Sequence, residues 1–312
     1  MKARTVLGVA LGTVGGAIIG DRLLKQRAGD LENPLPGVER TYRWRGIETT
    51  YTVAGDPNDP DMLLLHGIYA GSSSNEFAPI VEQLAEDYRV YVVDLPGFGR
   101  SERPPLVYSA SLYAEFIRDF ADEVTDEPIV VTSSLASAFA VDAADETDFE
   151  RLVLICPTDE TGDERPWVRT LLRTPIIGTT LYNLLASKPS IRYFFHRDGY
   201  YDSDRIDSDE VQYAWDSAHQ PGARYATASF AAATLDPEFD LATELAGLET
   251  PTTLVWGRDA ELIPLREGRD LAEAADLELV VIDYATQLPH AEHPDKFVEY
   301  LSAELPRVDI DE

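Results

Sequence analysis

Short apolar runs alternate with helix-like stretches along most of the chain, and this alternation restricts the possible fold more than any other feature of the sequence. Six of the runs are apolar almost throughout, which is typical of strands buried on both faces of a parallel sheet. Strands that alternate with helices predict a doubly wound α/β sheet with helices on both faces. The first two of eight expected strands form a hairpin around Gly46, and the eight are residues 42–45, 47–53, 62–66, 89–94, 129–132, 152–156, 252–257 and 279–283.

The alternation stops between residues 157 and 240. This interval contains helical patterns but no convincing strand signal. An insertion of this size between two strands is expected to form a helical lid over the carboxyl edge of the sheet, where lids shape pockets. The predicted organisation is an N-terminal segment (1–30), a core (38–156 and 241–305) and a lid (157–240).

The chain has 56 acidic and 26 basic residues, a net charge of −30, with acidic residues along its whole length. A surface of this sign argues against nucleic-acid binding. Only four residues are lysines, a composition that resembles proteins of salt-in halophiles, although an acidic mesophile protein is the alternative. The single cysteine, Cys156, excludes an internal disulfide and a cysteine-built metal site, and we expect neither a metal ion nor a cofactor.

The N-terminal segment carries no charge over residues 5–20 and has basic residues on both sides. It is shorter than the ~20 residues that span a bilayer, and no signal-peptide cleavage site follows. Its glycines recur every fourth residue, a spacing that lets membrane helices approach closely. We expect one helix over residues 6–19, not packed into the core. Two possibilities stay open: membrane association through residues 5–20, or a cytoplasmic protein whose N-terminus is disordered or lies on a surface.

Four sequence motifs follow one another in a specific order. They are His66-Gly67 at the end of a strand, Asp94-Leu-Pro-Gly97-Phe-Gly99-Arg-Ser101, the strand–turn–helix segment around Ser134, and the pair of segments that begin at Trp256-Gly257 and Leu288-Pro289. Their order and spacing over residues 40–305 resemble the α/β-hydrolase superfamily, close to its lidded branch of epoxide-hydrolase-like and ring-cleavage-hydrolase-like members.

The resemblance implies roles for particular residues. Ser134 occupies the position of the serine nucleophile, on a sharp turn between a strand and a helix. The backbone N–H groups of Ile68 and Leu135 would donate hydrogen bonds to an oxyanion. Asp94 is expected to fix its own turn by accepting backbone hydrogen bonds.

The positions of the acid and the base depart from the family pattern. The family reads W-G-x-x-D, and this chain has Ala260 in place of the Asp. The family reads G-H-x-P-H-x-E-x-P, and this chain has Thr286-Gln287 in place of G-H. Glutamine cannot accept a proton near neutral pH, so Ser134 lacks the usual base. We expect the Gln287 amide near the Ser134 hydroxyl, with Ala260 behind it.

Three functions are compatible with this site. The first is weak or rewired hydrolysis of a small, largely apolar ester-type substrate, in which His290 replaces the base and Asp159 the acid. The alternative role of His290 is that of a structural histidine beside Glu292. The second function is a non-catalytic ligand-binding or interaction protein on a hydrolase scaffold, and the third is a non-hydrolytic reaction such as a lyase or cofactor-free oxygenation.

The charge predicts that stability depends on salt. Repulsion among unscreened carboxylates destabilises the folded state at low ionic strength, so the melting temperature should rise with KCl up to molar concentrations. Thermal unfolding of the full chain across a KCl series measures this. A melting temperature that stays constant between low and molar KCl would contradict the halophile interpretation.

Overall fold

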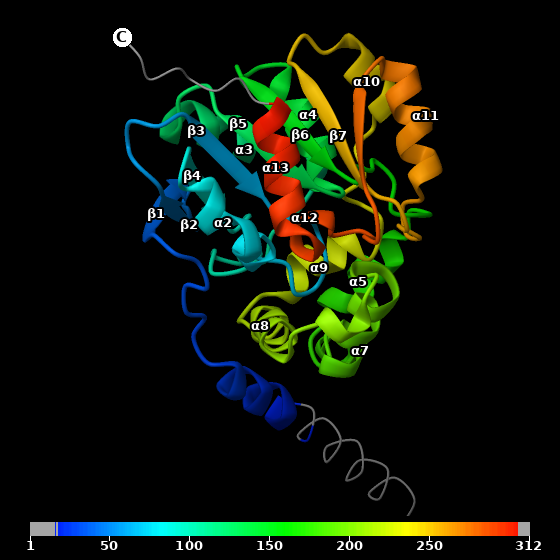
Figure 1. Cartoon of the computed structure of the whole chain (residues 1–312). Helices are drawn as coiled ribbons and strands as arrows, with labels where there is room; N and C mark the ends of the chain where they lie inside the picture. Colours follow the sequence, from blue (N-terminus) through cyan, green and yellow to red (C-terminus); the bar gives the residue numbers. More distant parts are fainter. Residues whose placement is uncertain (1–15, 17, 305–312) are drawn as a thin grey trace, which may run out of the picture.

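The computed structural model describes residues 16 and 18–304 (Figure 1). Its centre is an eight-stranded sheet in the order β1-β2-β4-β3-β5-β6-β7-β8. β2 pairs antiparallel with β1 and β4, and all other neighbours are parallel. The predicted mostly parallel, doubly wound sheet is therefore confirmed. The strands are β1 (Val38–Trp44), β2 (Ile47–Ala54), β3 (Asp61–Leu65), β4 (Arg89–Val93), β5 (Ile129–Ser133), β6 (Arg151–Ile155), β7 (Thr252–Gly257) and β8 (Glu278–Ile282).

The edge strand β1 begins four residues earlier than the sequence predicts. Its first four residues, from Val38 to Thr41, are exposed. A strand whose side chains contact mostly water needs no apolar run, so the sequence pattern gave no signal for this part of it.

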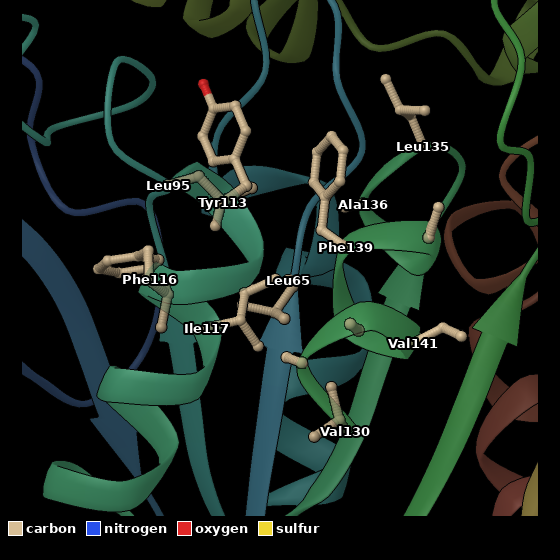
Figure 2. Close-up of a cluster of buried hydrophobic side chains, with 14 of the residues drawn as sticks. Leu65, Leu95, Tyr113, Phe116, Ile117, Val130, Leu135, Ala136, Phe139 and Val141 are labelled. Carbon is tan, nitrogen blue, oxygen red and sulfur yellow. The ribbon is translucent and has the colours of Figure 1, made fainter. Parts of the chain in front are cut away.

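Helices cover both faces of the sheet. One face carries α3 (Ala110–Val124), α4 (Ala136–Ala144), α10 (Leu241–Gly247) and α11 (Leu265–Ala275), and the other carries α2 (Ala78–Leu84), α12 (Pro289–Glu292) and α13 (Pro294–Glu304). In α3 the buried residues Tyr113, Phe116, Ile117 and Phe120 follow the three-to-four-residue period of one helix face. Figure 2 shows side chains of α3 and α4 meeting Leu65 of β3.

The described chain between β6 and α10 is mostly helical and contains no strand. It comprises α5 (Pro166–Arg173), α6 (Ile177–Leu185), α7 (Lys188–Phe194), a π-helical segment (Phe195–Gly199), a 3-10 turn (Ser203–Arg205), α8 (Ser208–Ala218) and α9 (Arg224–Phe230). The predicted boundaries, residues 157 and 240, fall just after β6 and at the N-cap of α10. The lid packs closely on the core: a Cβ on Gly71 would lie only 2.7 Å from the Ala214 carbonyl oxygen of α8.

The described part of the N-terminal helix, residues 18–28, lies beside the lid (Figure 1). Ala28 is buried against Phe195 and Trp215 of the lid, and the Asn183 amide of α6 donates a hydrogen bond to Asp21 at 3.3 Å. The predicted helix over residues 6–19 and the predicted membrane contact through residues 5–20 lie mostly outside the described residues. No helix within the described part of the chain combines the length and the apolar character needed to cross a bilayer.

The loops that follow β7 and β8 meet at the carboxyl edge of the sheet. The Asp259 N–H donates to the Ala285 carbonyl at 2.9 Å. A Cβ on Gly257 would lie 1.9 Å from the Thr286 carbonyl oxygen and 2.5 Å from that of Ala285. Since backbone atoms cannot swing aside like a side chain, only glycine allows this approach.

Replacing Gly257 by Ala should therefore force the two loops apart and destabilise the fold by about 2–3 kcal/mol, as overpacking does. Gly247→Ala is the matched control, because a Cβ there has no atom within 4 Å and α10 gains a better helix former. Urea unfolding of both variants measures the effect. Equal stability of the two variants would show that the loops have room to move.

Candidate active site

Ser134 lies on the sharp turn between β5 and α4, as the sequence predicts. It has a φ of 54°, in the left-handed region that non-glycine residues rarely adopt. The surrounding chain holds it there: the Ser134 N–H donates to the Ile155 carbonyl of β6 at 2.9 Å, and the Ser134 carbonyl accepts from the Ser137 N–H at 3.1 Å. This strained conformation lifts the serine out of the strand and turns the chain at once into the helix.

The His66-Gly67 segment packs directly against this turn. A Cβ on Gly67 would lie 2.8 Å from the Ser133 hydroxyl oxygen and 3.5 Å from the Ser134 Cβ. The next residue, Ile68, and Leu135 on the other side of the turn are both buried. Neither backbone N–H donates a hydrogen bond to any described residue. Two N–H donors thus remain free next to Ser134, as an oxyanion site requires.

Gln287, at the position of the family's base, is only 5 % exposed. Its side-chain oxygen and nitrogen are both buried without a hydrogen-bond partner among the described residues. Its backbone N–H donates to the Asp198 carbonyl of the lid at 3.4 Å. No hydrogen bond joins the Gln287 amide, or any described histidine, to the Ser134 hydroxyl. A buried polar group without a partner costs about 1–3 kcal/mol, so a group that hydrogen-bonds to the Gln287 amide would be favourable there.

Ala260, at the position of the family's acid, lies in an apolar cluster. It is 7 % exposed and packs with Cys156, Trp256 and Ile263. The neighbouring acidic residues Asp259 and Glu261 are exposed. Ala260 therefore contributes a methyl group to an apolar cluster, and the two neighbouring carboxylates lie outside it.

The two candidate replacements have other partners. The Asp159 carboxylate accepts the Leu241 N–H at the start of α10, at 2.8 Å. His290 is fully buried and packs against the rings of Phe77 and Phe297. Its Nε2 atom lies 3.5 Å from a carboxylate oxygen of Glu76. Among the described residues, neither His290 nor Asp159 forms a hydrogen bond or ion pair with Ser134, so they do not form a rewired hydrogen-bonded triad with it.

Glu76 is a site residue that the sequence analysis did not identify. One carboxylate oxygen accepts from the Ser133 hydroxyl at 2.5 Å and also faces His290, and the other accepts from the Gly67 N–H at 3.0 Å. Burial alone would raise its pKa, but the contacts with His290 and Ser133 outweigh burial and hold the pKa of Glu76 below its usual value. The sequence offers one signal for Glu76, which is its position directly before Phe77, where an apolar helix face begins.

The lid closes tightly over this carboxylate. A cavity of about 20 Å³ lies between them, lined by Glu76, Glu210 of α8 and Leu288 among others, and its volume is enough for about one water. Burial raises the pKa of Glu210 to about 7. The described residues contain no cluster of three or more His, Cys, Asp or Glu side chains able to hold a metal ion.

Glu76→Gln should destabilise the protein by about 1–3 kcal/mol at pH 7, because a neutral amide replaces a carboxylate held by charge-assisted contacts. A lowered pKa stabilises the fold above the unfolded pKa of ~4.3, and this stabilisation is lost as the pH falls through the folded pKa. The deficit should therefore shrink between pH 7 and pH 4 in urea unfolding at molar KCl. Glu82→Gln, on the exposed side of α2, is the control. A deficit that is equal at both pH values would contradict an ionised Glu76.

Comparison with known proteins agrees with this geometry. The pattern described as the alpha/beta hydrolase family matches residues 62–300. The chain is 31% identical over 248 residues to a pimeloyl-(acyl-carrier protein) methyl ester esterase of Aeromonas salmonicida, covering 77% of this chain and 93% of the relative. It is 24% identical over 297 residues to 2-hydroxy-6-oxo-6-(2'-aminophenyl)hexa-2,4-dienoic acid hydrolase of Metapseudomonas resinovorans, covering 83% and 88%.

Solved structures show the same fold. A serine hydrolase involved in carbazole degradation superimposes with a TM-score of 0.69 at 19% identity, covering 85% of this chain and 97% of that chain. A bacterial membrane phospholipase A superimposes with a TM-score of 0.67 at 18% identity, covering 97% and 96%. From the sheet order, the turn at Ser134 and these matches together, the chain belongs to the alpha/beta hydrolase family.

Proposed function

We propose that the site at Ser134 binds a small, largely apolar molecule with a carbonyl group and hydrolyses it slowly at most. The observation that carries this proposal is Gln287, which occupies the base position with both amide atoms buried and unpaired among the described residues. The strained turn at Ser134 and the two N–H groups without a partner among the described residues fit an ester-hydrolysing site. Gln287 offers no proton acceptor near neutral pH.

The chemistry of the serine explains the slow turnover. A serine hydroxyl attacks a carbonyl only when a base removes its proton, and an amide is too weak a base to do so near neutral pH. His290 does not replace the base, because it faces Glu76 on the Ser133 side of the turn. Losing members of a triad lowers turnover by several orders of magnitude, and the oxyanion donors sustain the residual rate.

The unpaired polar groups support ligand binding. A carbonyl oxygen can accept from the Ile68 and Leu135 N–H groups, and the Gln287 amide can both donate to the ligand and accept from it. A ligand that satisfies these groups removes the penalty of leaving them unpaired. The relatives are named for an ester and for a dienoic acid, and both compounds carry carbonyl groups.

A double-mutant cycle tests this proposal. Wild type should turn over p-nitrophenyl butyrate negligibly and should not react with a fluorophosphonate probe, which labels activated serines. Gln287→His alone should recover little, since no carboxylate fixes the imidazole tautomer. Gln287→His combined with Ala260→Asp should exceed either single variant at least tenfold.

The control is Ser134→Ala in the double variant, which should abolish turnover and labelling. A thermal melt of each variant checks that the Asp introduced into the apolar cluster around Ala260 leaves the fold intact. Substantial wild-type turnover that is lost in His290→Ala but retained in Gln287→Ala would refute the proposal and establish the rewired enzyme.

A further inference from the structure

Exposed apolar side chains gather on one part of the molecule. Sixteen large hydrophobic residues are exposed in the described chain, and nine of them lie on the N-terminal helix and the lid helices α5, α6 and α7. Single exposed hydrophobic residues are ordinary, but a contiguous group on a soluble surface marks an interaction site. We call this group the lid patch: Ile18, Ile19, Leu23, Trp167, Ile177, Leu181, Leu184, Leu185 and Tyr193.

The four helices that carry the lid patch are neighbours. On α6, Ile177, Leu181 and Leu184 recur every three to four residues and so share one helix face. α6 contacts both α5 and α7, and Asp21 of the N-terminal helix accepts a hydrogen bond from Asn183 of α6. Figure 1 shows the N-terminal helix and the lid helices at the same end of the molecule.

The charge of this region is opposite to that of the rest of the chain. Residues 165–197 contain six basic residues and no acidic residue, a charge of +6, whereas the other 279 residues carry −36. The six are Arg165, Arg169, Arg173, Lys188, Arg192 and Arg197. In the described chain only two of them pair with a carboxylate: Arg165 with Asp163, and Arg197 with Asp198. The other four have no carboxylate partner there.

A cleft lies between the N-terminal helix and α6. It has a volume of about 440 Å³ and is lined by the basic residues Arg22, Lys25 and Arg224 and by the acidic residue Asp21, among others. His219 also lines it; this side chain is buried, and its Nε2 atom has no hydrogen-bond partner among the described residues. Lys25 pairs with Asp21, while Arg224 bonds to the hydroxyl groups of Thr179 and Tyr225. The edge of the lid patch therefore holds basic groups that can receive an anionic headgroup.

We infer that the lid patch docks on a lipid bilayer that contains anionic lipids. The apolar side chains would enter the region between headgroups and acyl chains, and the basic residues would contact the headgroups. The acidic remainder of the chain is repelled by such a membrane. Salt at 0.1 M screens charges beyond about 10 Å, so the charges nearest the lipid, those of the basic segment 165–197, act on the membrane most strongly. This inference extends the membrane contact expected of residues 5–20 to the folded lid.

Trp167 allows a direct test with the full chain. It is 65% exposed, whereas the other three tryptophans of the chain, Trp44, Trp215 and Trp256, are at most 5% exposed. Vesicles of equal parts phosphatidylglycerol and phosphatidylcholine should shift the emission of Trp167 to the blue and protect it from acrylamide. Lipids brominated on the acyl chains should quench it, and Trp167→Phe should remove these changes. The measurement belongs at the lowest KCl concentration at which the protein stays folded.

Two further comparisons separate the contributions of apolar contacts and of charge to vesicle binding. Leu184→Asp combined with Leu185→Asp should weaken vesicle binding in a flotation assay at least tenfold. Leu262→Asp, a similarly exposed leucine outside the lid, should leave it unchanged. Vesicles of phosphatidylcholine alone should bind the wild type at least tenfold more weakly than the anionic vesicles.

Three results would overturn the inference. The first is no binding to anionic vesicles. The second is binding without shielding of Trp167, which would leave the N-terminal segment as the sole contact. The third is a double leucine variant that binds vesicles normally but changes oligomeric state in sedimentation, which would make a second copy of the chain the partner of the lid patch.

Discussion

The hydrogen bond from the Ser134 N–H to the Ile155 carbonyl, at 2.9 Å, holds a non-glycine residue in a left-handed conformation at the centre of the sheet edge. Neighbouring segments are arranged around this strained turn. A Cβ on Gly67 would come within 2.8 Å of the Ser133 hydroxyl oxygen, closer than side chains normally approach. Asp94, as expected, fixes its turn by accepting the Ser74 and Arg100 N–H groups. Since such strain persists only where the surroundings enforce it, these segments are mutually dependent.

Ala260 and Gln287, the two residues that depart from the family motifs, differ in how well they fit their surroundings. Ala260 completes an apolar cluster with Trp256 and Ile263 and leaves no polar group unpaired. Gln287 leaves both of its amide atoms buried and unpaired in the described chain. A conflict of this kind between a residue and its surroundings is expected at functional sites, and it locates the proposed ligand at Gln287. The polar contacts of Glu76 with Ser133 and Gly67 lie on the other side of the turn and stabilise the structure without serving Ser134.

The charge distribution separates the molecule into two parts with different surroundings. Acidic residues occur along the whole core sequence, and charged carboxylates favour water. The segment from Arg165 to Arg197 has none and exposes leucine, isoleucine and aromatic side chains. A lid that covers the site on one side and meets a bilayer on the other would place the proposed ligand site next to a source of apolar molecules.

The sequence by itself determined the sheet, the lid and the position of Ser134. Strand and helix signals arise from neighbouring residues, so the apolar runs identified every strand, and only the exposed start of β1 was missed. The departures from the family motifs at Ala260 and Gln287 are likewise features of the sequence alone, because they are identified by motif spacing. The tertiary structure alone decided which polar groups meet. Glu76 contacts Ser133 and His290, which are far away in the chain, and no local pattern distinguished it among 56 acidic residues. Asp159 and His290 were candidate partners of Ser134 only by their positions in the sequence. The loops after β6 and β8 instead bring Asp159 to Leu241 and His290 to Glu76.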